Sequence, residues 1–222
     1  MSANPRTIFK PAYSEAIISD DLADLTRIYQ DSVNICQINR AIDPRVQAFI
    51  DELLQSAVDI SVIENLAVNT FDFTGLLPAA RRIEGYAAFC QDITHLTTLF
   101  CDLFDLKRVG LRLRTLDRPM CPKFHVDAVP CRLVSTYGGI GTEWLKDKEV
   151  KRMKPVLVRH DSKDDPSEIV HDSSFIHTMP TFSVGLLKGI NWTGNELHGA
   201  VHRSPKLSAD LPRRLLLTLD FA

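Results

Sequence analysis

The sequence lacks the patterns that mark three broad classes of protein. No stretch approaches the roughly 18 consecutive apolar residues that cross a bilayer, and no Lys/Arg-rich run with interleaved aromatic residues marks a nucleic-acid surface. The five cysteines are odd in number, scattered and without a CxxC pair, which excludes a disulfide framework and a four-cysteine zinc site. Residues 1–6 show no secretory signal pattern. We therefore expect a cytoplasmic protein that binds neither membrane nor nucleic acid.

What is present is the composition of an ordinary globular domain. The 222 residues are 45% hydrophobic and 24% charged, with a formal net charge of −2, which suits one well-cored domain. Residues 1–105 are predicted to be mainly helical. An extended arm over residues 1–12 and a strand over residues 32–40 precede an amphipathic helix that starts at Asp43-Pro44. A second, longer helix runs from about Pro78 to Asp105.

Residues 106–222 have the period of strands instead. Residues 106–116 alternate apolar side chains with arginines, as a strand with one wet face does. Further strands are expected over residues 124–127, 132–137, 155–158, 182–187 and 214–221, and residues 146–154 have the composition of a solvated loop. A helical part packed against a run of short strands predicts an α+β fold with a double-stranded β-helix (jelly-roll or cupin-like) core, in a single domain over residues 1–222.

One short segment carries a metal-binding pattern. His125 and Asp127 lie two apart on a predicted strand, so their side chains point to the same side and present an imidazole and a carboxylate together. This is two thirds of a 2-His-1-carboxylate face, and His202 is the best candidate for the third ligand. His198 is a rival for that place. Cys121 is a further candidate, and a thiolate ligand would favour zinc over iron.

An arginine pair opens the last predicted strand, twelve residues after His202. The side chains of Arg213 and Arg214 must point to opposite faces of that strand, so only one of them can face the metal site, and we prefer Arg214. A planar guanidinium binds a carboxylate through two parallel hydrogen bonds, which suits it to hold an acidic cosubstrate. The arginines on two other predicted strands either line a cavity for an acidic substrate or form a wet strand face; they are Arg112, Arg114 and Arg132.

The order of these residues resembles a known family. His125-x-Asp127, then His202, then Arg214 on the final strand is similar to the pattern of iron(II)/2-oxoglutarate-dependent dioxygenases, and the turn over residues 138–144 resembles a Gly-Gly-x-Thr-x-aromatic segment in prolyl-hydroxylase-like members, with one extra residue. The resemblance implies that His125, Asp127 and His202 hold iron. It also implies that Arg214 binds 2-oxoglutarate, with help from Thr218 and Tyr137.

A second resemblance covers more of the chain. Four segments together are similar to the bacterial DUF1826 family, whose function is not established; they are residues 121–127, 141–145, 201–205 and 214–220.

Three hypotheses about function follow. The first is an iron(II) oxygenase that uses 2-oxoglutarate and dioxygen to hydroxylate a small-molecule or protein substrate. The second is a cupin-like metal enzyme without 2-oxoglutarate, and the third is a non-catalytic zinc-binding protein. The apolar helices of the first half either cover the sheet or form the interface of a homodimer. Arg214 separates the first two hypotheses, and the number of protein ligands separates the third.

Overall fold

A computed structural model describes residues 13–68, 71–150 and 173–222 of the chain. The predicted arm over residues 1–12 and the predicted strand over residues 155–158 lie outside these ranges. No helix in the described part of the chain is long and apolar enough to cross a membrane.

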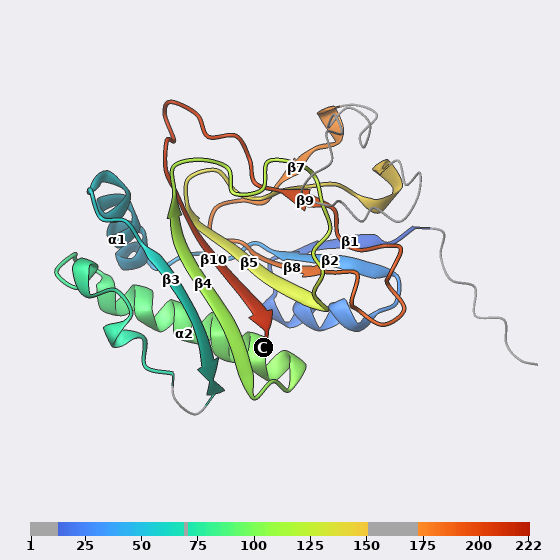
Figure 1. Cartoon of the computed structure of the whole chain (residues 1–222), viewed down its shortest axis with the longest axis horizontal. Helices are drawn as coiled ribbons and strands as arrows, with labels where there is room; N and C mark the ends of the chain where they lie inside the picture. Colours follow the sequence, from blue (N-terminus) through green and yellow to red (C-terminus); the bar gives the residue numbers. More distant parts are fainter. Residues whose placement is uncertain (1–12, 69–70, 151–172) are drawn as a thin grey trace, which may run out of the picture.

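A seven-stranded sheet forms the centre of the molecule (Figure 1), in the order β1-β2-β8-β5-β10-β4-β3. Its strand pairs are antiparallel except β1 with β2. The strands are β1 (Glu15–Ser19), β2 (Val33–Ile38), β3 (Ser61–Ala67), β4 (Arg108–Leu116), β5 (Cys131–Gly138), β8 (Val184–Lys188) and β10 (Arg214–Phe221).

A smaller sheet of three two-residue strands lies beside the large one. Its order is β7 (His177–Thr178), β6 (Glu143–Trp144) and β9 (His202–Arg203). The described part of the chain is therefore a mixed helix and sheet fold with one large sheet.

Two α-helices share the largest apolar cluster with the large sheet. Helix α1 (Pro44–Gln55) starts where predicted, because the Asp43 carboxylate accepts a hydrogen bond from the Arg45 backbone N–H and Pro44 takes the first turn. Its buried stripe is Val46, Phe49, Ile50 and Leu53.

Helix α2 (Tyr86–Phe104) is shorter than predicted. Gly85 has a left-handed φ of 82°, and a Cβ there would lie 2.0 Å from the Arg45 carbonyl oxygen. That backbone conformation breaks the predicted helix and leaves Pro78–Ala80 as a separate 3₁₀ turn, η4. The other 3₁₀ segments in the described ranges are η1 (Leu22–Tyr29), η3 (Phe73–Gly75), η5 (Asp147–Glu149) and η7 (Ser173–Phe175).

Three predictions from the sequence need correction. Residues 1–105 contain the predicted strand as β2, but they also contribute the strands β1 and β3, which were not predicted. The edge strand β3 shows no alternation because most of its side chains are exposed. Residues 124–127 do not form a regular strand: His125 makes a single bridge to His202. The loop after residue 145 is not wholly solvated either, since Asp147 is buried.

A polar cluster joins α2 to the sheet. The Arg40 guanidinium donates two hydrogen bonds to the Asp92 carboxylate, at 2.5 and 2.8 Å, and the Tyr137 hydroxyl donates a third at 2.5 Å. All three side chains are mostly buried.

Removing the shared carboxylate leaves a buried charge without its partner, so we expect Asp92→Ala to cost about 3–5 kcal/mol of folding free energy. Urea denaturation measures the loss. Lys107→Ala, which breaks the exposed Lys107–Asp105 pair, is the matched control and should change stability by less than about 1 kcal/mol. Equal effects of the two substitutions would contradict a structural role for the Asp92 cluster.

Candidate metal centre

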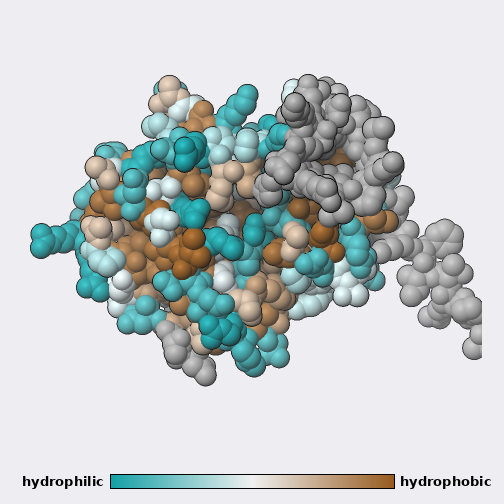
Figure 2. All heavy atoms as spheres, viewed as in Figure 1, coloured by the Kyte–Doolittle hydropathy of each residue, from teal (hydrophilic) through white to brown (hydrophobic). Residues whose placement is uncertain are grey.

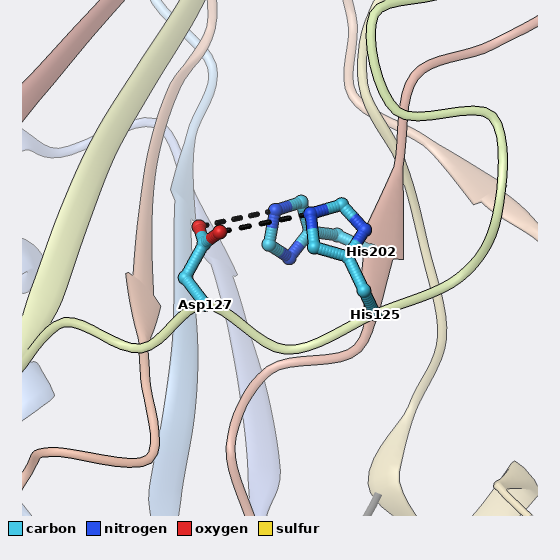
Figure 3. A group of neighbouring side chains, drawn as sticks. All are labelled: His125, Asp127 and His202. Atoms are coloured by element: carbon cyan, nitrogen blue, oxygen red, sulfur yellow. Dashed lines mark ion pairs between the residues drawn. The ribbon is translucent and has the colours of Figure 1, made fainter. Parts of the chain in front are cut away.

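The three predicted ligands come together although none of them lies in the large sheet. His125 and His202 exchange backbone hydrogen bonds, each N–H donating to the other's carbonyl oxygen at 3.0 Å. Their rings lie 4.5 Å apart between centroids. Asp127 follows on the same segment as His125, and Figure 3 shows both imidazoles directed at its carboxylate.

The donor atoms are close enough to share one ion. His125 Nε2 lies 3.6 Å from Asp127 Oδ1, and His202 Nε2 lies 3.3 Å from Asp127 Oδ2. One ligand atom from each residue falls within 4.8 Å of the others, and this is the one such cluster of three or more among the described residues. All three side chains are mostly buried, so the donor set fits a facially bound divalent ion.

Backbone carbonyls orient both imidazoles. His125 Nδ1 lies 3.0 Å from the Lys123 carbonyl oxygen, and His202 Nδ1 lies 3.1 Å from that of Ala200. A carbonyl can only accept, so each ring carries a proton on Nδ1, and a metal ion would bind by replacing the proton on Nε2, the atom nearest the Asp127 carboxylate. Such contacts fix the tautomer and ring orientation of metal-binding histidines.

The Asp127 carboxylate is held by an ion-pair network. Arg132 Nη1 donates to Asp127 Oδ2 at 2.8 Å, and the rest of its guanidinium donates to both oxygens of Asp220, at 2.6 and 2.9 Å. Arg112 also pairs with Asp220. Burial acts to raise the pKa of Asp127, but the opposing effect of His202, His125 and Arg132 is larger and holds that pKa well below its usual range. The carboxylate is therefore ionised and ready to bind a cation.

A cavity of about 40 Å³ adjoins the cluster, and Arg214 reaches it from β10. The guanidinium is buried, and its Nη2 donates to the hydroxyls of Thr136 at 3.0 Å and Thr142 at 2.8 Å. Its Nε is buried without a partner, and Arg214 makes no ion pair with any residue that the structure describes. Burial lowers the pKa of Arg214 to about 10, while Glu143 acts to raise it, so the side chain is charged at neutral pH.

The glycine-rich turn after β5 allows Thr142 to reach Arg214. Gly139 has a φ of 81°, and a Cβ there would lie 2.4 Å from the Arg213 carbonyl oxygen. Only glycine tolerates both the conformation and the close approach. The backbone of the turn at Gly139 therefore lies directly against the backbone of Arg213 and Arg214, at the start of β10.

Strand alternation separates the arginine pair as expected. Arg213 points to the other side of β10, where it donates to the carbonyl oxygens of Leu54, Ser56 and Val58 and pairs with Asp59. Thr218 faces the cavity with Arg214.

The structure does not bring Tyr137 to the cavity. Its side chain lies in the large apolar cluster shared with α1 and α2, and its hydroxyl is bonded to Asp92. The cavity side of β5 carries Arg132 and Val134 together with Thr136, so period-two alternation turns Tyr137 to the opposite face. The role predicted for Tyr137 does not fit this position.

The two rival ligands also lie outside the cluster. His198 Nδ1 is 2.8 Å from the Asp147 carboxylate, and Cys121 lines the cavity without belonging to the group of converging donor atoms.

Sequence reasoning missed the residues that support the site. Asp220 and Thr136 lie in apolar or ordinary strand contexts. Arg132 was named as a candidate cavity residue, but a solvent-exposed strand face was the favoured interpretation. Their roles depend on the register of β5 against β10, which pairs Arg132 with Asp220. Thr142 could have been found only from the Gly-Gly turn that precedes it, which resembles the Gly-Gly-x-Thr-x-aromatic segment.

Solved structures with a similar fold include the AtDAO1–2-oxoglutarate complex, from dioxygenase for auxin oxidation 1 of Arabidopsis thaliana. The identity is 9% and the TM-score 0.51, over 94% of this chain and 92% of that one. The rice dioxygenase for auxin oxidation is 12% identical with a TM-score of 0.49, over 94% of this chain and 82% of that one. Full-length Neurospora crassa T7H in complex with alpha-KG is 11% identical with a TM-score of 0.48, over 90% of this chain and 77% of that one. At 9% identity the likeness to AtDAO1 is one of fold alone.

No curated protein matches the sequence. A family model described as "Protein of unknown function (DUF1826)" matches residues 19–220, which is most of the chain. The protein is therefore a member of the DUF1826 family.

Proposed function

We propose that the protein is an iron(II)/2-oxoglutarate-dependent oxygenase that hydroxylates a substrate still to be identified. The observation that carries the proposal is the unpaired guanidinium of Arg214 beside a cluster of two histidines and one aspartate. In the described chain no carboxylate forms an ion pair with it.

A buried cation without a counter-ion is costly, because burial removes its hydration and two threonine hydroxyls do not neutralise its charge. A buried arginine without a counter-ion is best explained by an anionic ligand that neutralises its charge when bound. A carboxylate suits the planar guanidinium, whose buried Nε has no hydrogen-bond partner. One end of 2-oxoglutarate would bind Arg214, while the other end would lie toward the metal cluster across the same cavity.

The donor set favours iron over zinc. Two imidazoles and one carboxylate on a single face leave positions open for other ligands, as in non-haem iron(II) oxygenases. A thiolate, which would favour zinc, is not part of the converging set, since Cys121 is not among its donors. When bound, the iron would supply the oxidising chemistry that amino-acid side chains lack.

The fold also supports this function. The large and small sheets would form the two halves of a double-stranded β-helix, with the helical N-terminal part packed against the larger one. AtDAO1, whose overall fold is similar, is described as a dioxygenase in complex with 2-oxoglutarate. We extend that type of reaction to this chain as part of the proposal.

The chain's own residues would do the following work. His125, Asp127 and His202 would hold the ion, with Arg132 fixing the carboxylate in one orientation. Arg214, with Thr218 beside it on β10, would bind and orient the cosubstrate. The buried strand residues around the cavity would limit the access of water to it.

Replacing a metal ligand should remove metal binding. We expect His125→Ala and His202→Ala each to weaken binding of ferrous ion by more than about 100-fold, beyond the 10- to 100-fold typical of an outer-shell partner. Anaerobic calorimetry with ferrous ion measures the affinity. His198→Ala is the matched control, because His198 is bonded to Asp147, and should bind like the wild type. Loss of affinity in His198→Ala, together with normal binding by His202→Ala, would transfer the third-ligand role to His198.

Replacing Arg214 should affect the cosubstrate and spare the metal. In the ferrous-loaded protein, Arg214→Met should weaken 2-oxoglutarate binding by about 10- to 100-fold, the range expected for hydrogen bonds to a charged group. Anaerobic titration followed by the visible absorption spectrum checks this. Arg213→Met keeps Arg214 in place and should preserve the affinity. Metal binding without any 2-oxoglutarate binding by the wild type would instead favour a cupin-like enzyme that does not use this cosubstrate.

A further inference from the structure

A second cleft opens beside the metal cavity. It has a volume of about 440 Å³, within the range of small-molecule sites, and lies where β3 and β4 meet the segment that leads toward His125. Met120 lines both this cleft and the metal cavity, so the two spaces are neighbours. Figure 2 shows hydrophobic and hydrophilic side chains mixed over the region of β3 and β4.

Arg114 stands at the boundary of these two spaces. It pairs in register with Leu216 of β10 on one side and with Ser61 of β3 on the other. Leu216 lines the metal cavity, and directly opposed residues of antiparallel strands have Cα atoms about 4.5–5.5 Å apart. The Arg114 side chain therefore lies on the strand next to β10, beside the β10 side chains that line the metal cavity, which include Arg214 and Thr218.

The charge of Arg114 is not neutralised by any residue that the structure describes. Its Nε is buried without a hydrogen-bond partner, and its Nη1 contacts the Met120 sulfur at 3.8 Å. A thioether is only a weak acceptor. Arg214 is unpaired in the same way, but three other arginines near the metal cavity are neutralised: Arg112 and Arg132 pair with Asp220, and Arg203 pairs with Glu143.

The rest of the cleft suits a small anionic molecule. A second arginine, the exposed Arg118, adds positive charge, and Asp117 is the one carboxylate among the cleft residues. The hydroxyls of Ser61 and Thr115 also line the cleft, while Ile60 and Leu116 give it an apolar wall.

We propose that the substrate carries a carboxylate or phosphate group and that Arg114 binds this group beside the metal cavity. The inference rests on the proposed oxygenase function and adds a class of substrate to it. The anion would sit in the β3–β4 cleft, and the carbon to be hydroxylated would extend past Met120 toward the cluster of His125, Asp127 and His202. Arg114 would thus be a specificity residue, separate from the cosubstrate arginine on β10.

Methionine methyl groups give a local test. The chain has four methionines, and Met120 touches Arg114. Full-length protein with ¹³C-methyl methionine, loaded with one equivalent of zinc as a diamagnetic stand-in and saturated with 2-oxoglutarate, is titrated with propionate and, separately, with methyl phosphate. Met120→Leu assigns the reporter signal. We expect at least one of the two anions to shift the Met120 signal, and the effective one identifies the group.

The variants then locate the anion. Arg114→Gln should weaken the binding that shifts Met120 by about ten-fold or more, and Arg114→Lys should retain part of it. Arg108→Gln removes the same charge from β4 about 20 Å away and should leave the titration unchanged. An unchanged Met179 signal, from a buried methionine, verifies that each variant is folded.

The inference is wrong if neither anion shifts Met120 in the wild type, or if Arg114→Gln titrates like the wild type. Either result leaves 2-oxoglutarate binding at Arg214 intact. Failure of 2-oxoglutarate to bind would instead count against the oxygenase proposal, while an Arg114-dependent shift would still identify the anion site.

Discussion

The reciprocal backbone hydrogen bonds between His125 and His202 are the contact on which the site depends. They join two segments far apart in the sequence and hold both imidazoles over one carboxylate. Each ring is then oriented by a carbonyl two residues before it in its own segment, so the donor geometry is built largely from backbone. The Asp127 carboxylate is tied to the large sheet through Arg132 and Asp220. The cluster is thus assembled before any ion binds, which lowers the cost of binding one.

The two faces of the large sheet carry different groups of charged residues. One face packs against α1 and α2 and contains the Arg40–Asp92–Tyr137 cluster, whose charges are matched. The other carries several arginines in a small area. Those paired with Asp220 support the metal cluster, whereas Arg214 and Arg114 are left without a carboxylate in the described structure. Such unneutralised cations are where anionic ligands are expected, and we assign the cosubstrate to one and the substrate to the other.

Local pattern in the sequence predicted much of this arrangement. The His-x-Asp spacing and the alternation of Arg213 with Arg214 follow from short-range geometry, whereas His202 was predicted from the order of the residues along the chain. The start of α1 follows from a proline beside a capping aspartate. Predictions that depended on distant contacts did less well. Tyr137 faces Asp92 on the helix side, the segment around His125 is irregular, and β3 is an edge strand without alternation. The pairing of Arg132 with Asp220 depends on strand register, which no local pattern reveals.

The central claim is that one cavity holds both the ion and the cosubstrate. A crystal structure of the protein prepared anaerobically with ferrous ion and 2-oxoglutarate tests it most directly. We predict one ion bonded to His125 Nε2, His202 Nε2 and the Asp127 carboxylate, with the far carboxylate of 2-oxoglutarate on the Arg214 guanidinium. An ion bound elsewhere, or 2-oxoglutarate absent from Arg214 at saturating concentration, would contradict the account.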